Sequence, residues 1–172
     1  MNPFTKKIDN ASAPITAAAA QGYNPFAVAD ETADRLPLLK GGVQARAKVL
    51  AYRITPRTPT SGTYVYVDLE LLEVFAGMDQ PGDQVTHRLG GFESSGAAAA
   101  ARSLNELNFA IMPELKDKEG VSRSSLPGQM ADSEEVKGRE IFISTTEYTT
   151  KFIDPKTNKP RVIVKGEYKA AK

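Results

Sequence analysis

Two segments in the first half of the chain alternate strictly between apolar and polar positions. Odd positions from 43 to 51 and from 65 to 71 are alanine, valine or leucine, whereas most even positions are polar, charged or aromatic. A period of two predicts half-buried β-strands over about 43–52 and 63–75. The face opposite the apolar one then carries Arg46, Lys48, Tyr52, Tyr64 and Tyr66.

Four further elements follow from the pattern. Short apolar and β-branched runs predict strands over 84–89, 140–149 and 161–169. Between the first two of these runs, Ala100, Leu104, Leu107 and Ile111 recur at helical spacing, which predicts a helix over 96–112. Ser94 and Ser95 are candidate caps for this helix.

Segments rich in proline, glycine and serine separate these elements. The stretches 53–62 and 150–160 are expected to be loops, and 114–137 a long mobile loop. Residues 1–38 show no sustained period and are expected to form a loosely ordered N-terminal arm. Within this arm, Asn24 followed by Pro25 favours a short helix over 26–35.

The order of elements from 39 to 172 is strand, strand, strand, helix, strand, strand. This order is typical of the OB fold, a mainly β, five-stranded Greek-key barrel with one helix between strands 3 and 4. The chain is therefore expected to comprise the arm and one OB-fold domain over 39–172. An unrelated five-stranded α+β sheet has the same order and stays open as an alternative.

Charge is segregated along the chain, although the net charge is only +1. Residues 40–62 hold five cations and no acid, and residues 139–172 hold eight cations against four acids, whereas 63–138 is acidic. Two basic stretches favour a polyanionic partner, provided that folding brings them together. Otherwise they are two solvated surfaces that never meet.

In an OB fold these basic stretches fall in the loops that meet the ligand, since the fold binds through strands 2 and 3 and through the loops joining strands 1 to 2 and 4 to 5. Cations that follow the backbone and rings that stack on bases are what single-stranded nucleic acid requires. The candidate binding residues are Arg46, Lys48, Arg53, Arg57, Tyr64, Tyr66, Arg88, Lys151, Phe152, Lys156 and Lys159.

Several of these residues have structural alternatives. Tyr64 and Tyr66 are also typical of an aromatic pair that stabilises a sheet, and Phe152 of a side chain tucked under the barrel rim. Asp68 and Glu70 share the face of the tyrosines, so they either bound the groove or pair with Arg46 and Lys48. His87 is expected to be an ordinary strand or loop residue.

The strand order, the entry at Gly41 and Gly42, the strand over 64–72 and the hairpin over 138–168 together resemble phage-encoded single-stranded DNA-binding proteins of OB type. The resemblance covers about residues 38–170. It implies sequence-nonspecific DNA binding in replication, recombination or repair, with replication or recombination proteins as further partners. Many such proteins end in an acidic tail, whereas this chain ends in Lys169 to Lys172, which puts recruitment by a tail in doubt.

Composition argues against most enzymatic chemistry. The sequence has no cysteine and one histidine, and it contains no phosphate-binding loop motif. Asp132, Glu134 and Glu135 lack the spacing of a calcium site and are interpreted as a solvated loop. We therefore expect a cytoplasmic, non-enzymatic protein with no metal, cofactor or membrane span. RNA as the ligand, self-association, and a virion, assembly or protein-binding role stay open.

Overall fold

The computed structural model describes residues 35–59 and 61–171. All of these except Arg35 belong to a compact unit that comprises Leu36–Lys172. The predicted N-terminal arm lies outside the described residues except for its last four positions. The helix predicted over 26–35 lies outside them except for its last position.

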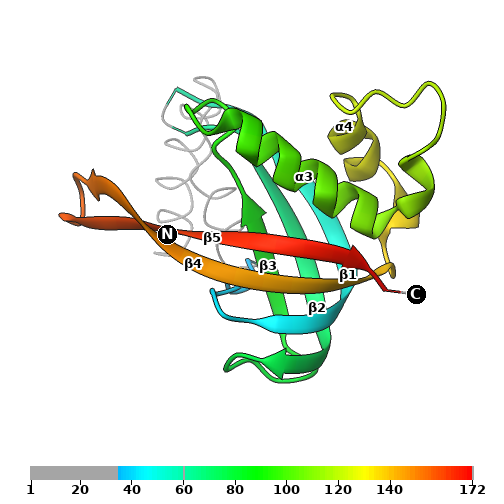
Figure 1. Cartoon of the computed structure of the whole chain (residues 1–172), viewed down its shortest axis with the longest axis horizontal. Helices are drawn as coiled ribbons and strands as arrows, with labels where there is room; N and C mark the ends of the chain where they lie inside the picture. Colours follow the sequence, from blue (N-terminus) through cyan, green and yellow to red (C-terminus); the bar gives the residue numbers. More distant parts are fainter. Residues whose placement is uncertain (1–34, 60, 172) are drawn as a thin grey trace, which may run out of the picture. The chain divides into compact units, whose positions relative to one another are not determined.

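Five antiparallel strands form one sheet in the order β3-β2-β1-β4-β5 (Figure 1). The strands are β1 (Gln44–Thr55), β2 (Tyr64–Ala76), β3 (Gln84–Leu89), β4 (Glu140–Asp154) and β5 (Lys159–Ala170). The predicted mainly β architecture with five strands is therefore confirmed. Within the described residues no ladder joins β3 to β5, so the sheet is open and its closure into a barrel is not confirmed.

The predicted long helix is confirmed as α3 (Ala97–Ile111), which packs against β4 and β5. The expected serine cap is wrong. The N-cap is Gly96 without a side-chain cap, and Ser94 Oγ accepts a hydrogen bond from the Gly96 amide just before the helix. Leu104, Leu107 and Ile111 are buried, as their spacing predicts.

The segment 114–137 is not the irregular loop that its composition predicts. It contains the end of η1 (Pro113–Leu115), the short helix α4 (Leu126–Ala131) and η2 (Glu134–Val136). Leu126, Met130 and Val136 are buried in the core, with α4 and η2 lying against β1. Proline and glycine break this segment into short pieces, but its apolar side chains still anchor it.

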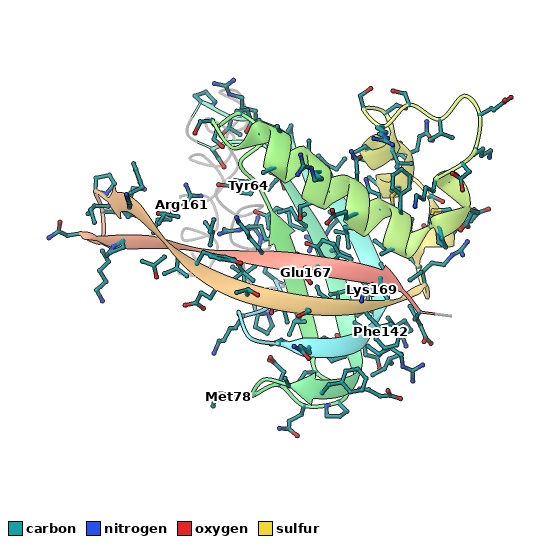
Figure 2. All side chains as sticks on the ribbon, in the orientation of Figure 1. Tyr64, Met78, Phe142, Arg161, Glu167 and Lys169 are labelled. Atoms are coloured by element: carbon teal, nitrogen blue, oxygen red, sulfur yellow. The ribbon has the colours of Figure 1, made fainter. Side chains whose placement is uncertain are left out.

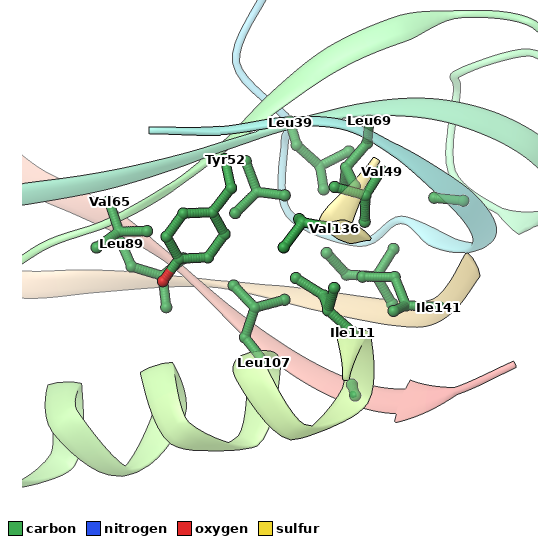
Figure 3. Close-up of a cluster of buried hydrophobic side chains, with 14 of the residues drawn as sticks. Leu39, Val49, Tyr52, Val65, Leu69, Leu89, Leu107, Ile111, Val136 and Ile141 are labelled. Carbon is green, nitrogen blue, oxygen red and sulfur yellow. The ribbon is translucent and has the colours of Figure 1, made fainter. Parts of the chain in front are cut away.

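The core lies between the inner face of the sheet and α3 (Figure 3). Val65, Val67, Leu69 and Leu71 of β2 all face it, as the alternation predicts. Tyr52 also faces it, contrary to prediction, because a register irregularity between Val49 and Ala51 reverses the alternation of β1.

The hydroxyl of Tyr52 donates a 2.9 Å hydrogen bond to Asn108 Oδ1 of α3. Burial of this tyrosine raises its pKa above the usual range, since the charged phenolate would lose its hydration. The bond therefore satisfies a polar group that would otherwise be costly to bury, and it links β1 to the helix.

The two edge strands approach each other through side chains. His87 of β3 is 1% exposed, and its Nε2 lies 2.7 Å from the hydroxyl of Tyr168 of β5. A Cβ at Gly166 would lie 2.5 Å from Cζ of Tyr168, so glycine lets this ring lie across β5. His87 is thus a strand residue, as expected, and it bridges the gap between the edges.

Residues just before β1 occupy part of the outer edge of β3. The amide of Leu39 donates to Thr86 O, and the amide of Thr86 donates to Pro37 O, both at 2.8 Å. Leu38 thereby forms a parallel bridge with Thr86. The backbone of β3 finds its second partner here rather than in β5, which explains why the edge strands meet only through side chains.

Candidate nucleic-acid interface

Four of the predicted binding residues contact one another on the outer face of β1, β2 and β3. The rings of Tyr64 and Tyr66 have centroids 6.1 Å apart. The guanidinium of Arg88 lies 5.2 Å from the centroid of Tyr64, and that of Arg53 lies 5.7 Å from the centroid of Tyr66. We call these four residues the tyrosine–arginine cluster.

The strand pattern explains why the cluster forms. Because Val65 and Val67 point into the core, their neighbours Tyr64 and Tyr66 must point outward. The sheet register then places Arg53 and Arg88 opposite Tyr66 on the two neighbouring strands. Such arginine–ring contacts are worth about 0.5–1 kcal/mol at exposed sites.

A glycine supports the ring of Tyr64. A Cβ at Gly90 would lie 2.6 Å from Cδ1 of that ring, so the ring rests directly on the backbone after β3. Both tyrosines of the cluster are half-buried. Their rings are held in place on the sheet, which lowers the ordering cost of binding a flat ligand.

Arg53 was predicted to lie in the loop after the first strand, but it lies on β1. One of its guanidinium nitrogens lies 2.8 Å from both carboxylate oxygens of Asp68. Asp68 also accepts a 2.6 Å hydrogen bond from Thr86 Oγ1. The positive charge of Arg53 is therefore largely balanced within the sheet.

Arg46 and Lys48 are likewise paired with carboxylates. Arg46 bridges Glu73 of β2 at 2.8 Å and Glu140 of β4 at 2.9 Å, and Lys48 pairs with Glu70. One predicted alternative is thus confirmed for Lys48, whereas Asp68 pairs with Arg53 instead of Arg46. These two cations offer a phosphate less attraction than the sequence suggests, since binding it would compete with existing ion pairs.

The loop between β1 and β2 presents Arg57 to solvent. The amide of Thr63 donates a 3.0 Å hydrogen bond to Glu93 Oε1, which ties the end of this loop to the connection between β3 and α3. This bond lowers the pKa of Glu93, and the nearby charge of Arg57 lowers it further. The hydrogen bond thus fixes the end of the loop that carries Arg57 at Thr63, the residue next to Tyr64 of the cluster.

The remaining predicted residues lie on the hairpin of β4 and β5, which extends beyond the rest of the sheet (Figure 1). The expected long tip is wrong, because β4 continues to Asp154 and carries Lys151 and Phe152, and β5 begins at Lys159. Only the turn 155–158 is left, with Lys156 in it.

Local hydrogen bonds close this turn tightly. The amide of Asn158 donates to Asp154 O and the amide of Lys156 to Asp154 Oδ1, both at 2.8 Å. Asn158 adopts a φ of 51°, a conformation that asparagine tolerates better than most residues. Phe152 is 59% exposed and is not tucked under the sheet.

The structure thus divides the predicted site into three groups. The tyrosine–arginine cluster is one, the ion-paired Arg46 and Lys48 are the second, and the hairpin residues are the third. Arg57, in the loop between β1 and β2, belongs to none of the three. The cluster lies on β1, β2 and β3, whereas the hairpin residues lie on β4, on β5 and in the turn between them.

Sequence reasoning missed a cationic contact on the hairpin. Lys165 Nζ lies 4.8 Å from the ring centroid of Tyr148. Both residues lie on strands that the pattern predicted, but their contact depends on the register that pairs Lys165 with Thr146 and so sets it diagonally across from Tyr148.

No protein family, curated protein or solved structure matches this chain. The function of the chain therefore has to be inferred from its own residues. Among the described residues no three potential ligands gather to hold a metal ion. Nor is any described helix long and apolar enough to cross a membrane. What the outer face does provide is two fixed aromatic rings, two arginines above them, and exposed cations at Arg57 and on the hairpin.

Proposed function

We propose that this chain binds single-stranded nucleic acid without sequence preference, with bases stacking at the tyrosine–arginine cluster. The observation that carries the proposal is the pair of rings flanked by Arg53 and Arg88 on the outer face of β2 and its neighbours. Rings and guanidinium planes accept any base, and each stacked base contributes about 1–3 kcal/mol. The exposed cations of Arg57 and the hairpin supply attraction for phosphates.

An OB fold is the architecture that we propose for this domain. It accounts for the strand order, the helix between β3 and β4, and the approach of β3 to β5 through His87 and Tyr168. The OB fold is a partly open barrel that binds oligonucleotides on strands 2 and 3 and on the flanking loops. We also propose a role in phage DNA replication, recombination or repair, because the sequence resembles phage-encoded single-stranded DNA-binding proteins of OB type.

Fluorescence anisotropy with a labelled oligo-dT of about 30 nucleotides tests the proposal directly. We expect binding at low salt that a duplex competitor displaces poorly and that weakens as salt rises. Absence of binding at low salt would contradict the proposal. It would favour the second candidate, a protein-binding or virion assembly module, for which the neutralised charges of Arg46, Lys48 and Arg53 argue.

Replacing the ring of Tyr66 should weaken binding markedly. Tyr66→Ala is expected to reduce affinity for oligo-dT about tenfold, the effect of losing roughly one stacked base, with little change in salt dependence. Tyr66→Phe is the matched control, since it keeps the ring and should bind within about twofold of the parent protein. Equal affinities for the alanine and phenylalanine variants would remove stacking from the mechanism.

Salt dependence should separate exposed cations from ion-paired ones. Each cation that contacts a phosphate of a single strand contributes about 0.7 to the slope of log K against log salt. We expect Lys156→Gln to lower the slope by about that amount. Lys48→Gln should leave the slope unchanged because Lys48 is paired with Glu70. Titrations at four salt concentrations measure both slopes. A lower slope for Lys48→Gln and an unchanged slope for Lys156→Gln would mean that phosphates displace Glu70 from Lys48.

A further inference from the structure

The large apolar side chains that the described part of the chain exposes fall almost entirely in two places. One group lies on the hairpin of β4 and β5, and the other lies around the β2–β3 turn. Apart from Leu38, the exposed residues are Phe75, Met78, Phe142, Tyr148, Phe152, Ile153 and Val162. Exposed apolar groups that cluster in this way mark interaction sites more often than scattered ones do.

The first surface is the hairpin over 148–165, which we call the hairpin finger. The ladder between β1 and β4 ends at Gln44 and Ser144, so the finger is a two-stranded ribbon without a third strand. Such ribbons are marginally stable alone and gain from a partner. The finger carries five cations and one acid, a net charge of +4 beside its apolar side chains.

The second surface comprises residues 73–84 with Phe142, and we call it the turn patch. The rings of Phe75 and Phe142 have centroids 6.2 Å apart, and Met78 is 95% exposed. Residues 73–84 contain three acids and no cation. Arg46 neutralises Glu73, which leaves Asp79 and Asp83 as the uncompensated charges.

The finger and the turn patch are complementary in chemistry but separate in space. Both expose aromatic and aliphatic side chains, and their charges have opposite sign. Figure 2 shows Arg161 of the finger at one side of the molecule, with Met78 and Phe142 at the lower end of the sheet. A contact between the two surfaces therefore has to join two molecules.

We propose that the hairpin finger of one copy of this chain docks on the turn patch of the next copy. The charges favour this contact over pairing of two fingers, because two surfaces of +4 repel each other. The contact joins two different surfaces, so each copy keeps one finger and one patch for further neighbours. Such heterologous contacts produce rings or filaments. The surfaces are small, so assembly is weak and depends on concentration and salt.

Sedimentation velocity of the full chain, freed of nucleic acid, tests this contact without DNA. The parent protein is expected to gain mass as concentration rises at low salt, and to return toward a monomer at high salt. One variant, Phe75→Ser with Asp79→Lys, damages only the patch. Another, Phe152→Ser with Lys156→Glu, damages only the finger. Phe75, Phe152 and Lys156 are exposed and Asp79 is half-buried, so circular dichroism melting is used to check that each variant folds.

Each variant alone should be monomeric, and an equimolar mixture should form a dimer, because the patch variant keeps an intact finger and the finger variant keeps an intact patch. A mixture that stays monomeric would overturn the proposal. So would a patch variant that assembles like the parent, since that indicates contact between fingers. A parent protein that is monomeric at all concentrations at low salt would also overturn it and leave the patch to a different protein. None of these outcomes depends on nucleic-acid binding.

Discussion

Acidification should destabilise this protein by about 3 kcal/mol through His87 alone. Burial lowers the pKa of His87 from 6.5 to about 4, because the imidazolium would lose its hydration among core side chains. Between these two values the unfolded chain binds a proton that the folded chain does not. The contribution of His87 to the free energy of unfolding is therefore highest above about pH 6.5 and falls as pH is lowered toward 4. Below about pH 4 His87 causes no further loss of stability.

Denaturant titrations of the parent protein and of His87→Gln between pH 7 and 4 measure this contribution. Carboxylates titrate in both proteins, so the difference between their plots of unfolding free energy against pH isolates the contribution of the histidine. Glutamine is chosen because its side chain can still form a hydrogen bond with Tyr168. His87 is the sole histidine of the chain, so its imidazole resonances are unambiguous in NMR. A folded-state midpoint near 6.5 would contradict the buried position described for it.

Gly41→Ala should lower the free energy of unfolding by about 3 kcal/mol or more, at or above the upper end of typical overpacking effects. A Cβ at this position would lie 2.7 Å from the backbone nitrogen of Glu147 and 2.9 Å from its Cα. Backbone atoms of β4 cannot rotate away as a side-chain tip can. Thr145 holds the two segments together, since its Oγ1 accepts from the Val43 amide and its backbone oxygen accepts from the Gly42 amide.

Gly128→Ala is the matched control for this substitution. Gly128 lies within α4, and a Cβ there would have no atom within 4 Å. Alanine is the better helix former by up to about 1 kcal/mol, so this variant should be as stable as the parent or slightly more stable. Thermal and urea unfolding of both variants provide the comparison. An unchanged midpoint for Gly41→Ala would mean that Glu147 of β4 lies further from Gly41 than described.

Local patterns predicted the elements that depend on neighbouring residues. The strand over 84–89 follows from its short apolar and β-branched run, and the helix α3 follows from its period, because it buries one face against the core. The hairpin was harder to predict. Pro160 argued against a strand at that position, but β5 is an edge strand and tolerates a residue that cannot donate to a ladder.

Contacts between distant strands could not be predicted from these patterns. The ion pairs of Arg46 depend on the register that sets it beside both Glu73 and Glu140. The inward position of Tyr52 depends on an irregularity that has no clear composition signal. Spacing did offer a signal for α4, since Leu126 and Met130 lie four residues apart, but Pro127 and Gly128 obscured it.

Strand β1 has a consequence for how the chain acquires its structure. Its partners on one side, β2 and then β3, follow directly along the chain, so this meander can form early. On the other side Val43 bonds to Thr145, which is 102 positions later. Closing so long a loop is slow, because its entropy is lost before any contact compensates for it. During synthesis, one edge of β1 therefore stays open until β4 has left the ribosome, and this interval is when the chain is most vulnerable to aggregation.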